Sequence, residues 1–148
     1  MKISSIRELE KIADKIKKIL LPGDVVFLYG EIGVGKTTFA RLLINSFENE
    51  KKIKKSEVLS PTFNIVFEYD VNEFIIKHYD LYRLKSHRDI NNIRLFEDLE
   101  QTVTLIEWPE LIKNKPQNRL DLFFEYKEDY NERSLIIKSN GRLKNHEF

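Results

Sequence analysis

Residues 25–38 read VVFLYGEIGVGKTT, and this stretch decides the fold. Its first five residues form a short, uncharged run of β-favouring side chains, which predicts a buried strand. Residues 30–37 match the pattern G-x-x-x-x-G-K-[ST] without a mismatch. After them, apolar residues return at helical spacing, at Phe39, Ala40, Leu42, Leu43 and Phe47. The glycines therefore lie between a strand and a helix, which is the context that a phosphate-binding loop requires.

The residue types in this loop suit the binding of phosphate. Gly30, Gly33 and Gly35 permit backbone angles that let successive N–H groups point at phosphate oxygens. The helix beginning near Lys36 adds partial positive charge, and the Lys36 ammonium can reach the β- and γ-phosphates. The Thr37 hydroxyl is suited to Mg²⁺. We predict that the nucleotide contacts Gly30, Glu31, Ile32, Gly33, Val34, Gly35, Lys36, Thr37 and Thr38.

A phosphate loop also needs a carboxylate near the metal or the attacking water, at the end of a neighbouring strand. Glu107 ends the apolar run 103–106, so a buried strand would deliver it to the ligand-binding edge of the sheet. An ordinary carboxylate at a strand end is the alternative. Asp80 follows the apolar-rich residues 74–79 and could lie near Mg²⁺ or water, although capping of a helix or turn explains it equally well.

Four other features are weaker signals. Residues 60–62, Ser-Pro-Thr, suit a loop that senses the γ-phosphate, but this is also common turn chemistry. Trp108, the only tryptophan, could support the site or pack in the core. His78 is interpreted as structural, and without cysteines we expect no zinc site. Arg83 could stabilise phosphate charge or pair with a carboxylate.

The remaining pattern predicts one α/β domain over residues 1–148, a mixed central sheet flanked by helices, with antiparallel hairpins. Ser5 with Glu8 is expected to cap the first helix. Residues 48–57 are charged and predict a solvated loop, with only a weak option for RNA or a partner. The other predicted segments are a helix over 5–20, extended segments over 58–69 and 74–79 joined by a turn at 70–73, a helix over 88–99, a second hairpin over 120–126 and 135–137, and a flexible tail over 139–148.

Composition narrows the setting of the protein. The 25 Lys and Arg residues nearly balance the 24 Asp and Glu residues, so the net charge of +1 gives no overall signature for nucleic acid or membrane. The absence of cysteine fits a reducing compartment. No apolar run is long enough for a signal peptide or a membrane span. We expect a cytoplasmic protein without membrane contact, whose RNA contacts are local or made through partners.

Four stretches in this order, LYGEIGVGKTTFARLL, SPTF, HYDLYRL and LIEWPE, resemble the bacterial TsaE (YjeE) family. The resemblance extends from about the first helix to Glu110. It implies a P-loop NTPase fold and an ATPase of tRNA threonylcarbamoyladenosine (t6A) biosynthesis. Two departures are modest: Asn64 stands where relatives often have Thr, and residues 48–57 are unusually rich in Lys. Both bear on the surface that meets partners rather than on the nucleotide site.

The resemblance also implies roles for individual residues. Lys36 would bind phosphate, Thr37 and Glu107 would coordinate Mg²⁺, and Asp80 would be needed for hydrolysis. Thr62, in a switch-like loop, and Trp108 would lie at the nucleotide. The predicted catalytic residues are thus Asp80, Glu107 and Lys36, with ATP and Mg²⁺ as ligands. Weak ATPase activity would support TsaD and TsaB partners that modify adenosine 37 of certain tRNAs, meeting tRNA through that complex.

Two other functions fit a phosphate loop. A small-molecule kinase would need an acceptor pocket and usually an Arg-rich lid, but after Glu107 only Arg119, Arg133 and Arg142 remain, and they are scattered. A nucleotide-controlled interaction module would bind ATP with little hydrolysis and act through the order of residues 60–70.

Overall fold

The structure is a computed structural model and describes residues 1–128 and 130–148. The run VVFLY forms strand β2 (Val25–Tyr29) at the centre of a seven-stranded sheet with the order β1-β7-β6-β2-β5-β4-β3. The other strands are β1 (Lys2–Ile3), β3 (Val66–Asp70), β4 (Ile75–Asp80), β5 (Thr102–Glu107), β6 (Arg119–Tyr126) and β7 (Arg133–Asn140).

The sheet is mixed, as the sequence predicts. Strand β2 pairs in parallel with β5 and β6, and β4 pairs in parallel with β5. The pairs β3–β4 and β6–β7 are antiparallel hairpins, and β1 adds an antiparallel edge next to β7. This architecture confirms the predicted P-loop NTPase fold with a mixed sheet and two hairpins.

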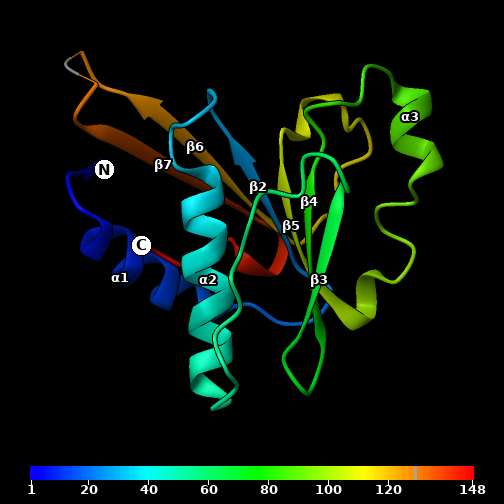
Figure 1. The fold of residues 1–148 in the computed structure, drawn as a ribbon, viewed down its shortest axis with the longest axis horizontal. Helices are drawn as coiled ribbons and strands as arrows, with labels where there is room; N and C mark the ends of the chain where they lie inside the picture. The colour runs from blue at the N-terminus through cyan, green and yellow to red at the C-terminus, as the bar shows by residue number, and fades with distance from the viewer. Residues whose placement is uncertain (129) are drawn as a thin grey trace.

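Helices cover both faces of the sheet (Figure 1). Helices α1 (Ile6–Lys17) and α2 (Lys36–Glu50) lie against one face, and α3 (His87–Asn92) lies beside the β4–β5 end on the other. Side chains of β2 contribute to the cores on both faces of the sheet, because successive residues of a strand point to opposite faces. Val26 and Leu28 join the core beneath α1 and α2, whereas Val25 and Phe27 join the core beneath α3.

Helix α1 begins where the sequence predicts. The Ser5 hydroxyl accepts a hydrogen bond from the backbone N–H of Glu8 at 3.2 Å, and the Ser4 N–H donates to the Glu8 carboxylate at 2.7 Å. The first contact satisfies an N–H group that the first turn of a helix leaves unpaired, and the second fixes the chain as it enters the helix. Leu9, Ile12 and Ile16 then form the buried face of the helix, which packs against α2.

Three predictions about irregular segments are wrong in part. Helix α2 continues to Glu50, and Glu48 is buried because its carboxylate accepts hydrogen bonds from Ser56, so residues 48–57 are not simply a solvated loop. The predicted helix over 88–99 is shorter, since α3 ends at Asn92 and Arg94 has a φ of 49°. Within 58–69, regular strand begins only at Val66. Short 3-10 helices occupy Leu99–Gln101, Pro109–Leu111 and Gly141–Leu143.

The predicted flexible tail is packed over its first part. Strand β7 continues to Asn140, and the following turn buries Leu143 completely in the core beneath α1 and α2. The Arg142 guanidinium forms an ion pair with Asp24, just before β2, with Nε to Oδ1 at 2.9 Å. This end of the chain therefore belongs to the domain core. Within the described ranges, no helix has the length and apolar character needed to cross a membrane.

Candidate functional site

The parallel pairing gathers the candidate residues at one edge of the sheet. Strands β2, β4 and β5 run in the same direction, so their carboxyl ends meet there. In the register of the sheet, Glu107 lies opposite Leu28 on one side and Asp80 on the other. The loop 30–35 follows β2 at the same edge and leads into α2. The phosphate loop and both predicted carboxylates are thus neighbours in space.

The backbone of the loop requires glycine. Gly30, Gly33 and Gly35 have φ values of 143°, 78° and 123°, a region that side chains disfavour. A Cβ atom on Gly30 would lie 2.6 Å from the Phe124 carbonyl oxygen of β6 and 2.8 Å from Val34 Cγ1. Gly35 is the N-cap of α2 and, as a glycine, offers no side chain to cap the helix. Free N–H groups at a helix N-terminus attract anions.

Lys36, the first residue of α2, is buried at the centre of the loop. Its ammonium donates to the carbonyl oxygens of Gly30 and Glu31, the latter at 2.9 Å, and lies 4.0 Å from the centroid of the Trp108 ring. Burial lowers the pKa of Lys36, and the nearby carboxylates, of which Glu107 has the strongest effect, oppose that shift. The side chain is therefore a desolvated cation, which interacts strongly with an added anion.

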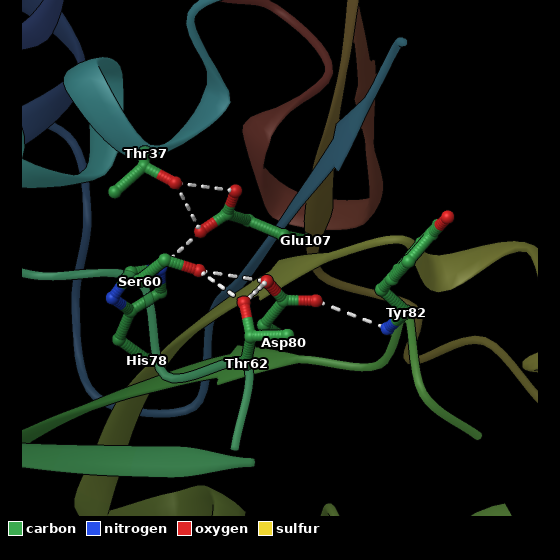
Figure 2. A network of polar contacts seen from close by, with 7 residues as sticks. All are labelled: Thr37, Ser60, Thr62, His78, Asp80, Tyr82 and Glu107. Atoms are coloured by element: carbon green, nitrogen blue, oxygen red, sulfur yellow. Dashed lines mark hydrogen bonds and ion pairs between the residues drawn. The ribbon is translucent and has the colours of Figure 1, made fainter. Parts of the chain in front are cut away.

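Glu107 is held from two sides (Figure 2). The Thr37 hydroxyl at the start of α2 is 2.8 Å and 3.0 Å from the two Glu107 carboxylate oxygens. On the other side, Nε2 of His78 lies 2.7 Å from Glu107 Oε2. His78 comes from β4 and is fully buried. Its Nδ1 atom is buried without a partner among the described residues.

The contact between His78 and Glu107 goes beyond the structural role that the sequence alone predicts for this histidine. One signal was present in the sequence. His78 stands two residues before Asp80 on a strand, so both side chains point to the same face. A histidine on the face that carries a candidate carboxylate is a candidate for contact with the site.

Asp80 ties the segment 58–65 to the sheet. Its Oδ2 atom accepts hydrogen bonds from the Ser60 hydroxyl at 2.8 Å and the Thr62 hydroxyl at 2.9 Å, and these hydroxyls are themselves 2.8 Å apart. Its Oδ1 atom accepts from the backbone N–H of Tyr82 at 3.0 Å. Figure 2 shows this cluster directly beside Glu107. The Ser-Pro-Thr segment is therefore attached through two hydrogen bonds to Asp80, one of the two predicted carboxylates.

These groups surround one pocket of about 400 Å³, here called the main pocket. Its lining residues come from the phosphate loop and α2, from the segment 58–65, and from the ends of β4 and β5: Ile32, Gly33, Gly35, Lys36, Thr37, Thr38, Ser60, Thr62, Asp80, Tyr82, Glu107 and Trp108. Gly30, Glu31 and Val34 shape the loop without lining the pocket. Arg83 does not line the pocket, and its guanidinium donates to the Phe63 carbonyl oxygen at 3.1 Å.

The arrangement combines an anion site with oxygen ligands for a hard cation. Thr37 and Glu107 offer a hydroxyl and a carboxylate at one point of the pocket wall. Mg²⁺ is usually held by one or two carboxylates together with substrate phosphates and water. Within residues 1–128 and 130–148, no cluster of three or more His, Cys, Asp or Glu side chains could hold a metal by itself. The donor set therefore suits a cation that is shared with bound phosphates.

Comparison with known proteins connects this geometry to a family. The family model described as "Threonylcarbamoyl adenosine biosynthesis protein TsaE" matches residues 3–135. A relative from Rickettsia conorii, named tRNA threonylcarbamoyladenosine biosynthesis protein TsaE, is 41% identical over 112 residues, which are 76% of this chain and 62% of that protein. The chain thus spans less than two thirds of that relative's length. The Bacillus subtilis protein of the same name is 34% identical over 136 residues, covering 90% of this chain and 81% of that protein.

A solved structure agrees with the sequence matches. The crystal structure of YdiB from Bacillus subtilis superposes with a TM-score of 0.72 at 29% sequence identity. The similarity covers 95% of this chain and 84% of that chain. It therefore extends into the β6–β7 hairpin, which lies beyond the motifs that carry the resemblance in the sequence.

Proposed function

The chain belongs to the TsaE family, and from this premise we propose that it binds and hydrolyses ATP with Mg²⁺ in the biosynthesis of threonylcarbamoyladenosine in tRNA. The observation that carries the proposal is the contact between Thr37 and Glu107, two residues 70 positions apart. It joins the hydroxyl of the phosphate loop to a buried carboxylate at the end of a neighbouring parallel strand. That pair is what a P-loop enzyme needs to hold the metal of a metal–nucleotide complex.

The loop supplies the charge that the phosphates need. The N–H groups at the start of α2 and the Lys36 ammonium form a fixed positive lining, which a bound polyphosphate would contact. Lys36 now donates to carbonyl oxygens of its own loop, and phosphate oxygens would take their place as acceptors. Because Lys36 is desolvated, it stabilises charge that develops on the γ-phosphate more strongly than an exposed lysine would.

In this proposal Asp80 would orient the attacking water. Its carboxylate lines the main pocket beside Glu107, and its two oxygens are already engaged by hydroxyls and a backbone N–H. A carboxylate fixed in this way can accept a proton or a hydrogen bond from water with little reorganisation. Mg²⁺, held by Thr37 and Glu107, would neutralise charge on the β- and γ-phosphates. Because the Ser60 and Thr62 hydroxyls donate to Asp80, a change in the hydrogen bonds of Asp80 would alter the order of the segment 58–65.

We also propose that TsaD-like and TsaB-like proteins are the partners of this chain. The names of the relatives place them in t6A biosynthesis, and the reaction on adenosine 37 of tRNA would then be carried out by the partner complex. ATP hydrolysis by this chain would reset that complex between turnovers. Contact with tRNA would be made through the complex, which agrees with a net charge of only +1.

Reconstituted tRNA modification tests this function. Under conditions in which tRNA exceeds enzyme, the partner proteins with the wild-type chain and ATP should modify many tRNA molecules per complex. The variant Asp80→Asn, which keeps the size of the side chain, should stop after about one turnover. Full modification with that variant would reject the hydrolytic cycle and favour a passive nucleotide switch. Rapid transfer of phosphate from ATP to a metabolite would favour a kinase.

A further inference from the structure

A groove of about 650 Å³ lies between α3 and the chain that follows β5, and is here called the α3 groove. One wall comes from α3 and the turn after it, within residues 87–97, and the other wall comes from residues 112–114. Figure 1 shows α3 on the opposite side of the molecule from α1. Among the described residues, none lines both this groove and the main pocket. The groove is therefore a space separate from the candidate nucleotide site.

The floor of the α3 groove is apolar. Ile90, Leu95 and Ile112 line it, and all three belong to the hydrophobic core beneath α3. Within α3 itself only Ile90 is buried, so one side chain anchors this short helix to the core. Apolar anchors of a partner bind best in concave, desolvated pockets of this kind. The groove can therefore accept apolar side chains from another molecule.

The rim of the groove carries more positive than negative charge. Arg94 and Lys113 come from the two walls, and Glu97 is the only acidic residue among the described lining residues. Arg94 pairs with Glu97 at 3.3 Å, but both side chains are more than half exposed. Such an exposed ion pair contributes little to stability, so another carboxylate can replace Glu97. Lys113 is exposed as well. The rim therefore favours an occupant that carries negative charge.

His87, the first residue of α3, lines the same groove and offers a further polar contact. Its Nδ1 atom is buried and has no hydrogen-bond partner within the described parts of the chain. A buried polar atom without a partner is costly. An imidazole nitrogen can donate to a carboxylate or carbonyl oxygen, so a bound polar group would supply the missing partner once the ring turns toward it.

The floor of the groove is also connected to both candidate carboxylates. Leu81 belongs to the same hydrophobic core as the floor and is almost completely buried. It directly follows Asp80, and its N–H donates to the Glu107 carbonyl oxygen at 3.1 Å. An occupant that shifts α3 would therefore act on the backbone that carries Asp80 and Glu107.

We propose that the α3 groove is a docking site for an acidic segment with apolar side chains from a partner protein, and that docking there raises ATP hydrolysis in the main pocket. This inference rests on the proposed function, because the partners concerned are the TsaD-like and TsaB-like proteins. Apolar side chains of the segment enter the floor, and its carboxylates contact Arg94 and Lys113. A protein segment fits better than RNA, because two cations are few for a phosphate backbone and the floor is largely aliphatic.

Affinity for the purified complex of the TsaD-like and TsaB-like proteins, measured by biolayer interferometry with Mg²⁺ and ADP, tests the docking site. Arg94→Glu and Lys113→Glu should each weaken binding about tenfold or more, whereas Arg94→Lys, which keeps the charge, should stay within about threefold. Lys11→Glu reverses an exposed charge on α1 and is the matched control, which should bind as the wild type does.

Phosphate release from ATP tests the connection to the main pocket. Without partners, the three reversal variants should hydrolyse ATP at the wild-type rate, because none of the changed residues lines that pocket. The complex should raise the rate of the wild-type chain. In Arg94→Glu and Lys113→Glu, about tenfold more complex should be needed for the half-maximal effect.

Wild-type affinity in both groove variants, or an unchanged requirement for the complex, would overturn the docking site and leave the proposed function intact. An equal loss in Lys11→Glu or in Arg94→Lys would overturn it too, since charge at this groove would not be what matters. If the groove variants lose affinity for tRNA alone, the occupant is RNA, and if they dissociate a dimer of the chain, it is a second copy; both reject the proposal. If the wild-type chain does not bind the complex, the proposed partnership fails and the docking site fails with it.

Discussion

The Glu107 carboxylate is buried at the end of β5, where an unpaired charge would be strongly destabilising. Thr37 of α2 lies 2.8 Å from one carboxylate oxygen and His78 of β4 lies 2.7 Å from the other, so both oxygens have a partner. A side chain fixed in this way has little freedom to rotate. At the residue scale, His78 acts as a positioning residue: it does not line the main pocket, but it orients a carboxylate that does.

Replacement of His78 tests this positioning role. His78→Leu removes the hydrogen bond to Glu107, so the Mg²⁺ concentration that gives half-maximal binding of ADP should rise about tenfold. His78→Gln can still donate through its amide and should restore most of the effect. A fluorescent ADP analogue titrated at fixed concentration with increasing Mg²⁺ gives the measurement. An unchanged Mg²⁺ requirement in His78→Leu would show that Glu107 needs no support from this ring.

At the element scale, the segment 58–65 has little regular structure: Val58 and Ile65 pack against the core at its two ends, and polar contacts attach its middle to Asp80 of β4. Thr62 and Ser60 both donate to Asp80, and the Asp80 N–H donates to the Ile65 carbonyl oxygen at 2.9 Å. A stretch whose hydroxyls are held by one carboxylate can change its order when that acceptor gains another partner. The loop is therefore suited to respond to ligands in the main pocket.

Hydrogen–deuterium exchange measures how firmly this segment is attached. Thr62→Val keeps the shape of the side chain but removes one hydroxyl, so amides in 58–65 should exchange about two- to tenfold faster, since one hydrogen bond contributes roughly 0.5–1.5 kcal/mol. Ser46→Ala, whose hydroxyl bonds to Asp14 between α2 and α1, is the control and should leave this segment unchanged. Equal exchange in Thr62→Val and wild type would contradict the coupling to Asp80.

The phosphate loop has little tolerance for a side chain at Gly30. Gly30→Ala should destabilise the domain by about 1–3 kcal/mol from its positive φ and by roughly a further 1–3 kcal/mol from crowding. Gly23→Ala separates these terms, because Gly23 also has a positive φ, 103°, but nothing lies within 4 Å of its added Cβ. Urea unfolding gives both free energies. Equal destabilisation of the two variants would refute the close approach of the loop to Phe124.

Local patterns predicted most of the elements, and long-range contacts account for the errors. The strand, loop and helix over residues 25–50 follow from adjacent residues alone. Glu48 looked solvated because its partner Ser56 lies beyond the end of the helix. Residues 88–99 have the apolar spacing of a helix, but the positive φ of Arg94 turns the chain there. The same apolar residues therefore pack against the sheet without helical geometry.

For the whole molecule, the packed C-terminus was the largest departure from prediction. Residues 139–148 are polar and lack periodicity, which is typical of a tail. Leu143 is nevertheless fully buried, Phe148 packs against the same core, and Arg142 pairs with Asp24 just before β2. Two isolated apolar residues, Leu143 and Phe148, form no periodic pattern that sequence can reveal. The candidate carboxylates could be predicted because strand ends in a parallel sheet share one edge. The contact of His78 with Glu107 could not, because it depends on the register of β4 against β5.

Substitution in this segment tests whether the C-terminal turn belongs to the core. Leu143→Ala should lower the free energy of unfolding by about 2–4 kcal/mol, because it removes a fully buried leucine side chain. Lys144→Ala changes the next, exposed residue and should stay within about 0.5 kcal/mol of wild type. Chemical denaturation of both variants checks this. Equal stability of Leu143→Ala and wild type would show that the C-terminal turn does not contribute to the stability of the core.

The central claim is that Lys36, Thr37 and Glu107 form a site that hydrolyses ATP. The most direct test is phosphate release from ATP by the purified chain with TsaD-like and TsaB-like partners, with Mg²⁺ and with excess chelator. The account predicts release by the wild-type chain that falls by at least about 100-fold in Lys36→Met, in Glu107→Gln and after chelation. Wild-type rates in either variant, or rates unaffected by chelation, would contradict it.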